Sequence, residues 1–315
     1  MTDNSPNELS ACRDGPSLLI HLLSRLMRRL PIYSGLTRLS FNWLTNHLFR
    51  QCRGDLEATL LNGTRMLVDP NDYHGRILYL FGTNDPKVHW VTQSLLRRGD
   101  RFLDIGANYS SIGLLAADAV GPTGHVHLFE PQPDLCQRVG EAIRCAEITN
   151  VTLHRLGLMD HDDELVLSRP RHHSGMATFV GRGDDDAWIS QSLPVRDIAT
   201  YVPPLIANYA FGVKLDVEGA EPSLMPWLVR QDNLRFIVFE VAHNQPELWN
   251  IVQSCGLHLY GLCRRVFRMQ IQLISSPAEM SKFHDVVAVR LTSGAKAPGR
   301  VHPIRLRRLI APAPA

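Results

Sequence analysis

Residues 101–120 read RFLDIGANYSSIGLLAADAV and pass from an apolar β-rich run to a helical stretch through one short turn. In the turn, Gly106 permits a tight bend and a close approach of a ligand to the backbone. Asn108 is one of the few non-glycine residue types that tolerate left-handed backbone geometry. The stretch therefore predicts a strand, a ligand-binding turn and a helix in immediate succession.

Outward from this stretch, short β-rich apolar runs alternate with helical stretches between about residues 99 and 290. This alternation is typical of a parallel sheet covered by helices. We expect an α/β fold whose core is a seven-stranded, doubly wound, Rossmann-like sheet. The seven predicted strands are 101–105, 125–130, 151–158, 211–217, 235–242, 257–263 and 284–290.

The same patterns divide the chain into four parts. They are an N-terminal helical extension (1–55), a lead-in or cap segment (56–98), the sheet domain (99–291) and a basic, proline-containing tail (292–315). Within the sheet domain, residues 160–200 break the alternation with two short strands around a polar loop, and we expect this insertion beside the substrate entrance. We expect the tail to be flexible. The pair His172–His173 and the acidic run 184–186 are interpreted as solvated loop residues of the insertion.

Composition narrows the class of protein. The chain has 33 Lys and Arg against 31 Asp and Glu, a net charge of +2, which argues against nucleic-acid binding by the chain as a whole. Its six cysteines show neither a C-x-x-C pair nor zinc spacing, so a reduced, cytoplasmic protein is expected. The first residues are acidic and polar, and no apolar run reaches the length of a membrane span, so secretion and membrane insertion are not expected.

The segment 17–30 predicts an amphipathic helix with leucines at helical spacing and arginines near its end. Two interpretations stay open for this helix. It packs on the main domain or on a second subunit, or it makes peripheral contact with an anionic membrane.

A nucleoside site is predicted where the first two strands end, because ligands of open α/β sheets bind beyond the carboxyl ends of the strands. Glu130 ends the second strand, 24 residues after Gly106, and can accept two hydrogen bonds from ribose hydroxyls. NAD or S-adenosylmethionine would both supply a ribose. The turn lacks the glycines of a pyrophosphate site, and the Asp104 carboxylate before it would repel a pyrophosphate but suit a sulfonium or ammonium group. The charge therefore favours S-adenosylmethionine.

Three strings in this order, DIGAN (104–108), FEPQP (129–133) and VKLDVEGAE (213–221), closely resemble the FkbM family of S-adenosylmethionine-dependent methyltransferases. YLFGTNDP (79–86) and IVFEV (237–241) are also similar to that family, so the resemblance covers roughly residues 78–290. It implies a seven-stranded methyltransferase fold and methyl transfer to a hydroxyl oxygen. The acceptors that it implies are saccharides, glycolipids or natural products.

By this resemblance, Asp104, Gly106 and Asn108 would line the methionine end of the cofactor and Glu130 its ribose. Ser110, also a cofactor-site residue, departs from the family pattern D-x-G-A-N-x-G, where the last glycine stands in its place. A serine fits there if its φ is negative; a positive φ would weaken cofactor affinity.

The string VKLDVEGAE brings Lys214, Asp216 and Glu218 to one face by strand alternation. Lys214 and Asp216 are either a buried ion pair beneath the site or catalytic groups. In the catalytic interpretation, Asp216 orients the acceptor hydroxyl or the cofactor ammonium, and Lys214, with its pKa lowered by burial, helps to remove the proton. Glu221 suits the first turn of the next helix and is expected to be structural.

The strand at 235–242 ends near further candidates. His243, close to Glu240, is a candidate general base for the acceptor alcohol, although a lone histidine in a loop is more often simply solvated. Asp216, Glu240 and Asn244 are oxygen ligands that could instead bind a divalent cation, although we expect no metal. Phe179 and Trp188 are candidates for stacking on a sugar ring.

We therefore expect an S-adenosylmethionine-dependent O-methyltransferase that acts on a small-molecule or glycan acceptor, in the cytoplasm or peripheral to a membrane, without a nucleic-acid partner. Two alternatives stay open: an NAD-linked oxidoreductase on a similar sheet, and a non-enzymatic methyltransferase-like binding module.

Overall fold

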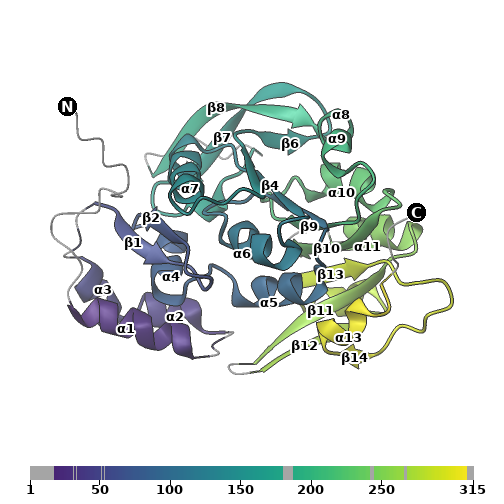
Figure 1. Ribbon diagram of the computed structural model, residues 1–315, viewed down its shortest axis with the longest axis horizontal. Helices are drawn as coiled ribbons and strands as arrows, with labels where there is room; N and C mark the ends of the chain where they lie inside the picture. The colour runs from purple at the N-terminus through teal and green to yellow at the C-terminus, as the bar shows by residue number, and fades with distance from the viewer. Residues whose placement is uncertain are drawn as a thin grey trace.

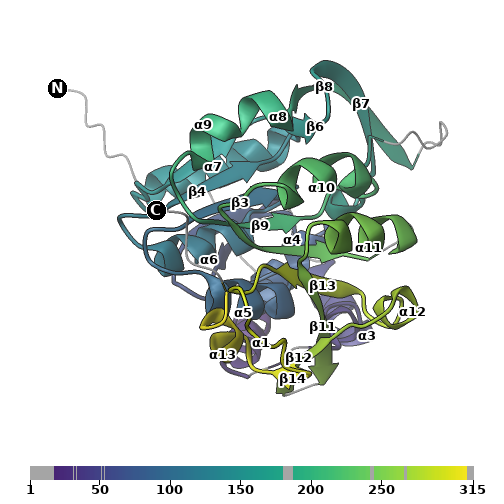
Figure 2. The ribbon, with the colours of Figure 1, turned by 90° about the vertical axis from the view of Figure 1, so that its right-hand side faces the viewer.

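The computed structural model describes residues 18–30, 32, 34–50, 52, 54–179, 187–241, 245–265 and 268–310. A mixed sheet of nine strands forms its centre, with helices on both faces (Figures 1 and 2). From one edge to the other the strands are β14 (Arg300–Val301), β12 (Arg268–Leu273), β11 (His258–Arg265), β13 (Asp285–Val289), β10 (Leu234–Glu240), β9 (Phe211–Leu215), β3 (Arg101–Ile105), β4 (His125–Phe129) and β5 (Val151–His154). The predicted doubly wound α/β fold is confirmed.

The five strands from β10 to β5 are parallel, and β13 runs antiparallel to both of its neighbours, β10 and β11. Strand order reverses at β3, because the chain adds β4 and β5 on one side and β9 and β10 on the other. In the register, Ile105 at the end of β3 pairs with Phe129 of β4 and Leu215 of β9. The carboxyl ends of these strands are therefore level, at the place where an α/β sheet binds its ligands.

The helices cover the two faces of the sheet with separate apolar cores. Along β3, Phe102 belongs to one core and Leu103 and Ile105 to the other, as strand alternation requires. The first core is completed by α4 (Tyr73–Phe81), α5 (Pro86–Leu95), α6 (Ser111–Val120), α7 (Pro133–Cys145) and α13 (Pro303–Arg307). The second is completed by α8 (Ile198–Tyr201), α9 (Pro203–Ile206), α10 (Glu221–Val229), α11 (Gln245–Ser254) and α12 (Pro277–Met280).

Smaller elements surround the central sheet. The insertion forms the two expected strands, β7 (Asp163–Pro170) and β8 (Trp188–Asp197), which join β6 (Gly157–Met159) in a three-stranded sheet next to the 3-10 turn η1 (Ser174–Met176). The lead-in segment pairs β1 (Leu56–Thr59) with β2 (Arg65–Val68). The N-terminal extension forms α1 (Leu18–Arg29), α2 (Leu36–Ser40) and α3 (Trp43–Phe49), which lie at one end of the molecule (Figure 1).

The number of strands in the central sheet differs from the predicted seven. The run 151–158 was expected as one strand, but it contains the end of the main sheet, β5, and the start of β6 in the small sheet. Two strands of the central sheet, β12 and β14, were not predicted. Both lie toward one edge of the sheet, where β12 alternates polar and apolar residues (RMQIQL) instead of forming a continuous apolar run.

The expectation of a flexible tail is wrong for residues 292–310. Leu306 and Ile310 are buried in the first core. Arg307 donates to the carbonyl of Leu96 at 3.0 Å, and Arg97 donates in return to the carbonyl of Arg307. The two apolar side chains at positions 306 and 310 therefore anchor the tail to the core despite its basic composition.

Among the cysteines that the structure describes, Cys136, Cys145 and Cys255 are free thiols. Among the described helices, none is both long enough and apolar enough to cross a bilayer.

Candidate cofactor and acceptor site

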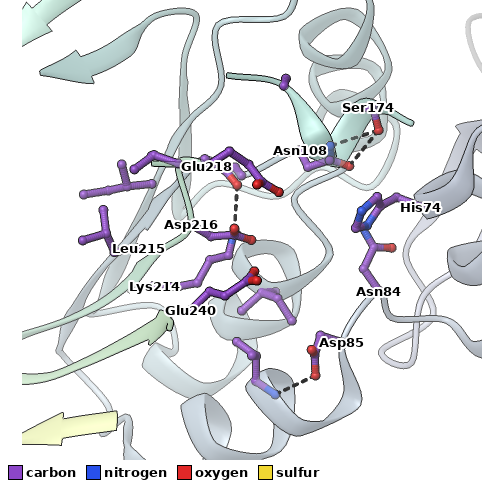
Figure 3. A pocket seen from close by; sticks show the side chains of 18 of the residues that line it. His74, Asn84, Asp85, Asn108, Ser174, Lys214, Leu215, Asp216, Glu218 and Glu240 are labelled. Carbon is purple, nitrogen blue, oxygen red and sulfur yellow. Dashed lines mark hydrogen bonds and ion pairs between the residues drawn. The ribbon is translucent and has the colours of Figure 1, made fainter. Parts of the chain in front are cut away.

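A cavity of about 500 Å³ opens beyond the carboxyl ends of β3, β4, β9 and β10, within the size range of small-molecule sites. Figure 3 shows acidic side chains from the β9 and β10 ends on one side and His74 and Asn84 on the other. Of the predicted site residues, the cavity is lined by Gly106, Asn108, Glu130, Lys214, Asp216 and Glu240. Asp104 and Ser110 are fully buried behind its wall.

The turn after β3 has the predicted geometry. Gly106 has a φ of 75° and Asn108 a φ of 52°, both left-handed. The amides of Gly106 and Ala107 donate to the carbonyl of Phe129 at 3.1 and 3.0 Å, which ties the turn to the end of β4. The Asn108 side chain donates to Ser174 Oγ at 3.0 Å, so the insertion is held against the turn (Figure 3).

Ser110 has a positive φ, which is the less favourable of the two backbone conformations possible for a serine at this position. Its φ is 54°, so the condition for an unstrained serine, a negative φ, is not met. Its hydroxyl is buried and has no hydrogen-bond partner among the described residues. The strain that the sequence analysis linked to weaker cofactor binding is therefore present, although the side chain itself does not line the cavity.

Glu130 is held rigidly at the end of β4. Its Oε2 accepts from the Asn108 amide at 2.7 Å and its Oε1 from the Gln132 amide at 2.9 Å. Burial raises the pKa of Glu130 to about 7, against the opposing effect of these two hydrogen bonds. Each carboxylate oxygen keeps a lone pair for a further donor, because two backbone bonds use only half of its acceptor capacity.

Lys214 lies between two carboxylates at the end of β9. Its Nζ is 3.4 Å from Asp104 Oδ1 and 3.2 Å from Asp216 Oδ2, and it donates to the carbonyl of Gly106 at 2.6 Å. Burial by itself would lower the pKa of Lys214, but the charges of Asp216 and Asp104 outweigh it and the pKa is raised. The predicted lowering of this pKa is wrong, because the two neighbouring carboxylates outweigh the effect of burial.

Asp216, Glu218 and Glu240 converge on the cavity, with carboxylate oxygens within 4.8 Å of one another. Glu218 has a φ of 49°, and the preceding strand already ends at Leu215, so the loop rather than strand alternation brings these acids together. Burial and the nearby Asp216 charge raise the pKa of Glu240 to about 7. The spacing could accommodate one divalent cation, with Glu218 in the place predicted for Asn244.

A second group of titratable residues in the cavity wall was missed by sequence reasoning. His284 Nε2 lies 3.1 Å from Glu240 Oε1, and its Nδ1 lies 3.3 Å from Asp285 Oδ1. Lys87, at the start of α5, pairs with Asp285 and with Asp85 at 3.3 Å. A signal existed for His284 and Asp285: an antiparallel last strand must begin at the edge where the parallel strands end.

Two histidines on the opposite wall were also missed or misread. His173 was interpreted as a solvated loop residue, but it lines the cavity and stacks on Tyr73 with ring centroids 4.4 Å apart. The ring centroid of His74, in α4, lies 5.3 Å from that of His173. Burial lowers the pKa of His74 to about 4. Nothing in the local sequence of the lead-in segment indicates that α4 reaches this cavity, since its approach depends on tertiary packing.

The remaining predictions have mixed outcomes. His243, Asn244 and residues 184–186 lie outside the described residues. Phe179 lines the cavity, whereas Trp188 does not. Glu221 is structural as expected: its carboxylate accepts from the amides of Val217 at 3.1 Å and Gly219 at 3.0 Å and so fixes the loop that carries Asp216.

Comparison with known proteins gives partial similarities. No family model matches the chain. A protein-L-isoaspartate O-methyltransferase from Ignicoccus hospitalis is 35% identical over 66 residues, which are 21% of this chain. The chain spans about a third, 31%, of the length of this relative.

Several solved structures are also similar. A precorrin-6y C5,15-methyltransferase from Geobacter metallireducens has a TM-score of 0.38 and 11% identity, over 67% of this chain and 92% of its own. Aeropyrum pernix fibrillarin with bound S-adenosyl-L-methionine has a TM-score of 0.35 and 14% identity, over 62% and 68%. An S-adenosylmethionine-dependent O-methyltransferase from Thermotoga maritima has a TM-score of 0.36 and 9% identity, over 66% of each chain. With TM-scores below 0.5, these similarities do not by themselves assign a function.

Proposed function

We propose that the protein is an enzyme, an S-adenosylmethionine-dependent methyltransferase that transfers a methyl group to a hydroxyl oxygen. The observation that carries this proposal is the charge of the cavity. Glu130 lies in one wall, and the carboxylates of Asp216, Glu218 and Glu240 gather in another. Such a cavity suits a ligand with a ribose and a positively charged sulfonium and ammonium end, and it would repel a pyrophosphate. The matched segment of an O-methyltransferase supports the same assignment.

The residues present fit the cofactor. Two backbone amides orient the Glu130 carboxylate. Each oxygen keeps a lone pair that can accept a hydrogen bond from a ribose hydroxyl. Gln132, which is 4% exposed and lines the cavity, has an Oε1 atom without a hydrogen-bond partner in the described part of the chain. A buried amide oxygen of this kind is satisfied when a bound ligand donates to it.

The sheet supports a methyltransferase over the NAD-linked alternative. A dinucleotide-binding domain has parallel strands in the order 3-2-1-4-5-6. Here β13 is antiparallel and lies between β10 and β11. Together with a turn that lacks the further glycines of a pyrophosphate site, this arrangement favours the cofactor with a sulfonium group.

The chain's own groups would position the acceptor and take its proton. When bound, S-adenosylmethionine supplies a methyl group activated by its sulfonium charge. Asp216 and Glu240 orient the acceptor hydroxyl, and Glu240, with a pKa of about 7, accepts its proton. Lys214 stays charged and holds Asp216 in place instead of acting as a base. Alignment of the hydroxyl oxygen with the methyl carbon provides much of the rate acceleration.

Several finer points belong to this proposal. Membership of the FkbM family, a saccharide, glycolipid or natural-product acceptor, and a cytoplasmic location rest on the sequence motifs and composition alone. The role of Asp104 at the methionine end of the cofactor also remains a prediction. So does the role of His243 as a general base. The absence of a nucleic-acid partner and of a metal is likewise a prediction.

Calorimetric titration with S-adenosylmethionine, S-adenosylhomocysteine and NAD tests the proposal. We expect micromolar binding of the first two and none of NAD. Binding of NAD alone would replace the proposal with the oxidoreductase. The positive φ of Ser110 favours one other candidate, a binding module without turnover. Cofactor binding with no methyl transfer to any hydroxylated acceptor, in a screen that begins with sugars and glycolipids, would favour that module.

A further inference from the structure

The N-terminal extension has an unusual charge composition. Between Asp14 and Asp55 the sequence contains no Asp or Glu, while it contains six arginines: Arg25, Arg28, Arg29, Arg38, Arg50 and Arg53. The whole chain has nearly balanced charge, so this segment is a local concentration of positive charge. A local basic surface indicates an anionic partner.

The same segment exposes most of the large apolar side chains found on the described surface. On α1, Leu18 is 74% exposed, and Leu22 and Leu26, each four residues further on, are more than half exposed. Trp43, at the start of α3, is 81% exposed. The full set in this segment is Leu18, Leu19, Leu22, Leu26, Leu30, Leu39, Trp43 and Leu44, called here the α1–α3 surface.

These leucines are not the core-facing side of α1. That side carries Ile20 and Ser24, both buried, and Ser24 Oγ donates to the carbonyl of Tyr79 in α4 at 2.8 Å. Arg28 donates to the same carbonyl at 2.7 Å. Because α1 is already anchored through another face, its leucine face is available for a partner.

Four arginines of the segment, Arg25, Arg29, Arg38 and Arg50, are exposed near the apolar side chains. A helix with leucines on one face, arginines at its edge and a nearby exposed tryptophan has the composition of an element that lies in a lipid–water interface. Each arginine near an anionic bilayer contributes to binding through the negative surface potential.

We propose that the α1–α3 surface docks the protein onto an anionic lipid bilayer. A second copy of the chain fits the surface less well, because a symmetric dimer would place the same arginines opposite one another without a single acid in the segment to pair with them. An anionic membrane satisfies both the apolar and the charged part of the surface at once.

The docked surface is connected to the cavity. The end of the link between α1 and α2 and the first turn of α2 supply part of the cavity wall, with Ser34, Gly35, Leu36 and Thr37. Thr37 Oγ1 lies 2.6 Å from the hydroxyl of Tyr73, another wall residue. Docking would therefore hold the cavity wall close to the bilayer and favour an acceptor that carries a lipid anchor, an extension that rests on the proposed methyltransferase function.

Co-sedimentation with vesicles tests the docking. The full chain is mixed with phosphatidylcholine vesicles and with vesicles that also contain phosphatidylglycerol, at low and at high salt. We expect binding to the mixed vesicles only, and a loss of binding at high salt. The double variant Arg25→Gln/Arg29→Gln should lose about fivefold in partition coefficient per arginine. Leu22→Gln should lose about tenfold.

Matched controls lie elsewhere on the surface. Arg144→Gln removes an exposed arginine of α7, and Val166→Gln removes a side chain in β7 that is 55% exposed. Both should bind vesicles like the parent. Binding that is equal on neutral vesicles, or equal in the α1–α3 and control variants, would overturn the proposal. So would a dimer in sedimentation velocity that Leu22→Gln dissociates.

The cofactor titration on the same preparations separates the two proposals. Vesicle binding with no S-adenosylmethionine binding would reject the proposed function and leave the docking surface supported. Cofactor binding by a chain that ignores anionic vesicles would reject the docking surface alone.

Discussion

Gly106 and Asp216 pack so closely that a Cβ atom on Gly106 would overlap the carbonyl oxygen of Asp216. The two residues directly follow the neighbouring strands β3 and β9, and their contact joins the predicted cofactor turn to the loop that carries the acids. The left-handed φ of Gly106 and the lack of a side chain are both needed there.

Gly106→Ala should therefore destabilise the protein by about 4 kcal/mol and abolish measurable cofactor binding, because alanine adds both backbone strain and an overlap. Urea unfolding measures the first effect and calorimetry the second. Gly99→Ala is the control: its φ is 88°, but its Cβ would lie 3.7 Å from the nearest atom, Thr123 Oγ1. It should cost only about 1 to 2 kcal/mol. Equal losses in both variants would contradict the packing argument.

Ser110→Gly should stabilise the protein by about 1 kcal/mol, since it relieves a left-handed serine and removes a buried hydroxyl without a partner among the described residues. Thermal or urea unfolding measures the gain. Glu147→Gly, at an exposed position with a φ of 51°, relieves the backbone alone and should gain less. A loss of stability in Ser110→Gly would show that the hydroxyl has an unrecognised function.

Lys214→Met should destabilise the protein by about 3 to 5 kcal/mol, because it leaves the fully buried Asp104 carboxylate without its cation. The double variant Asp104→Asn/Lys214→Met should recover about 2 kcal/mol relative to the sum of the single losses. Urea unfolding of the parent, the variants Asp104→Asn and Lys214→Met and the double variant completes this double-mutant cycle. Strict additivity would mean that the pair does not interact.

Stability of the cofactor-free protein should fall between pH 4.5 and pH 7 through Glu130. Burial raises its pKa from 4.5 to about 7 in the folded protein. The folded state then binds more protons than the unfolded state in this interval, so the contribution of this group is complete below pH 4.5 and is lost as the pH rises through 7. The loss is roughly 3 kcal/mol. Urea unfolding across this range should show a flatter profile for Glu130→Gln, and identical profiles would reject the raised pKa.

The two ends of the cavity should respond differently to mutation. Glu130→Ala should weaken S-adenosylmethionine binding at least tenfold, since it removes the acceptor expected for the ribose. Asp216→Ala should slow methyl transfer by about a hundredfold and change cofactor affinity little. Glu164→Ala, at an exposed acid of β7, should change neither. If Glu130→Ala binds the cofactor like the parent, the placement of the cofactor is wrong.

The sequence by itself determined the features that depend on local spacing. Residues 101–108 predict strand, turn and left-handed geometry, and the acid at 130 predicts the ribose side of the site. The turn has the predicted geometry and Glu130 lies in the cavity wall, because strand alternation and turn chemistry involve residues close in the chain. The ribose contact of Glu130 stays a prediction. The doubly wound sheet follows from repetition of the same local pattern.

Tertiary structure alone decided the charges and neighbours within the cavity. Burial at 214 predicts a lowered lysine pKa, but the charge of Asp216 and that of Asp104, 110 positions earlier in the chain, raise the pKa instead. His284 meets Glu240 only because β13 runs antiparallel beside β10, and His173 meets Tyr73 only because the insertion folds onto α4. A pKa and a partner depend on desolvation and on atoms a few ångströms away, and such distances are set by packing between segments that local periodicity does not connect.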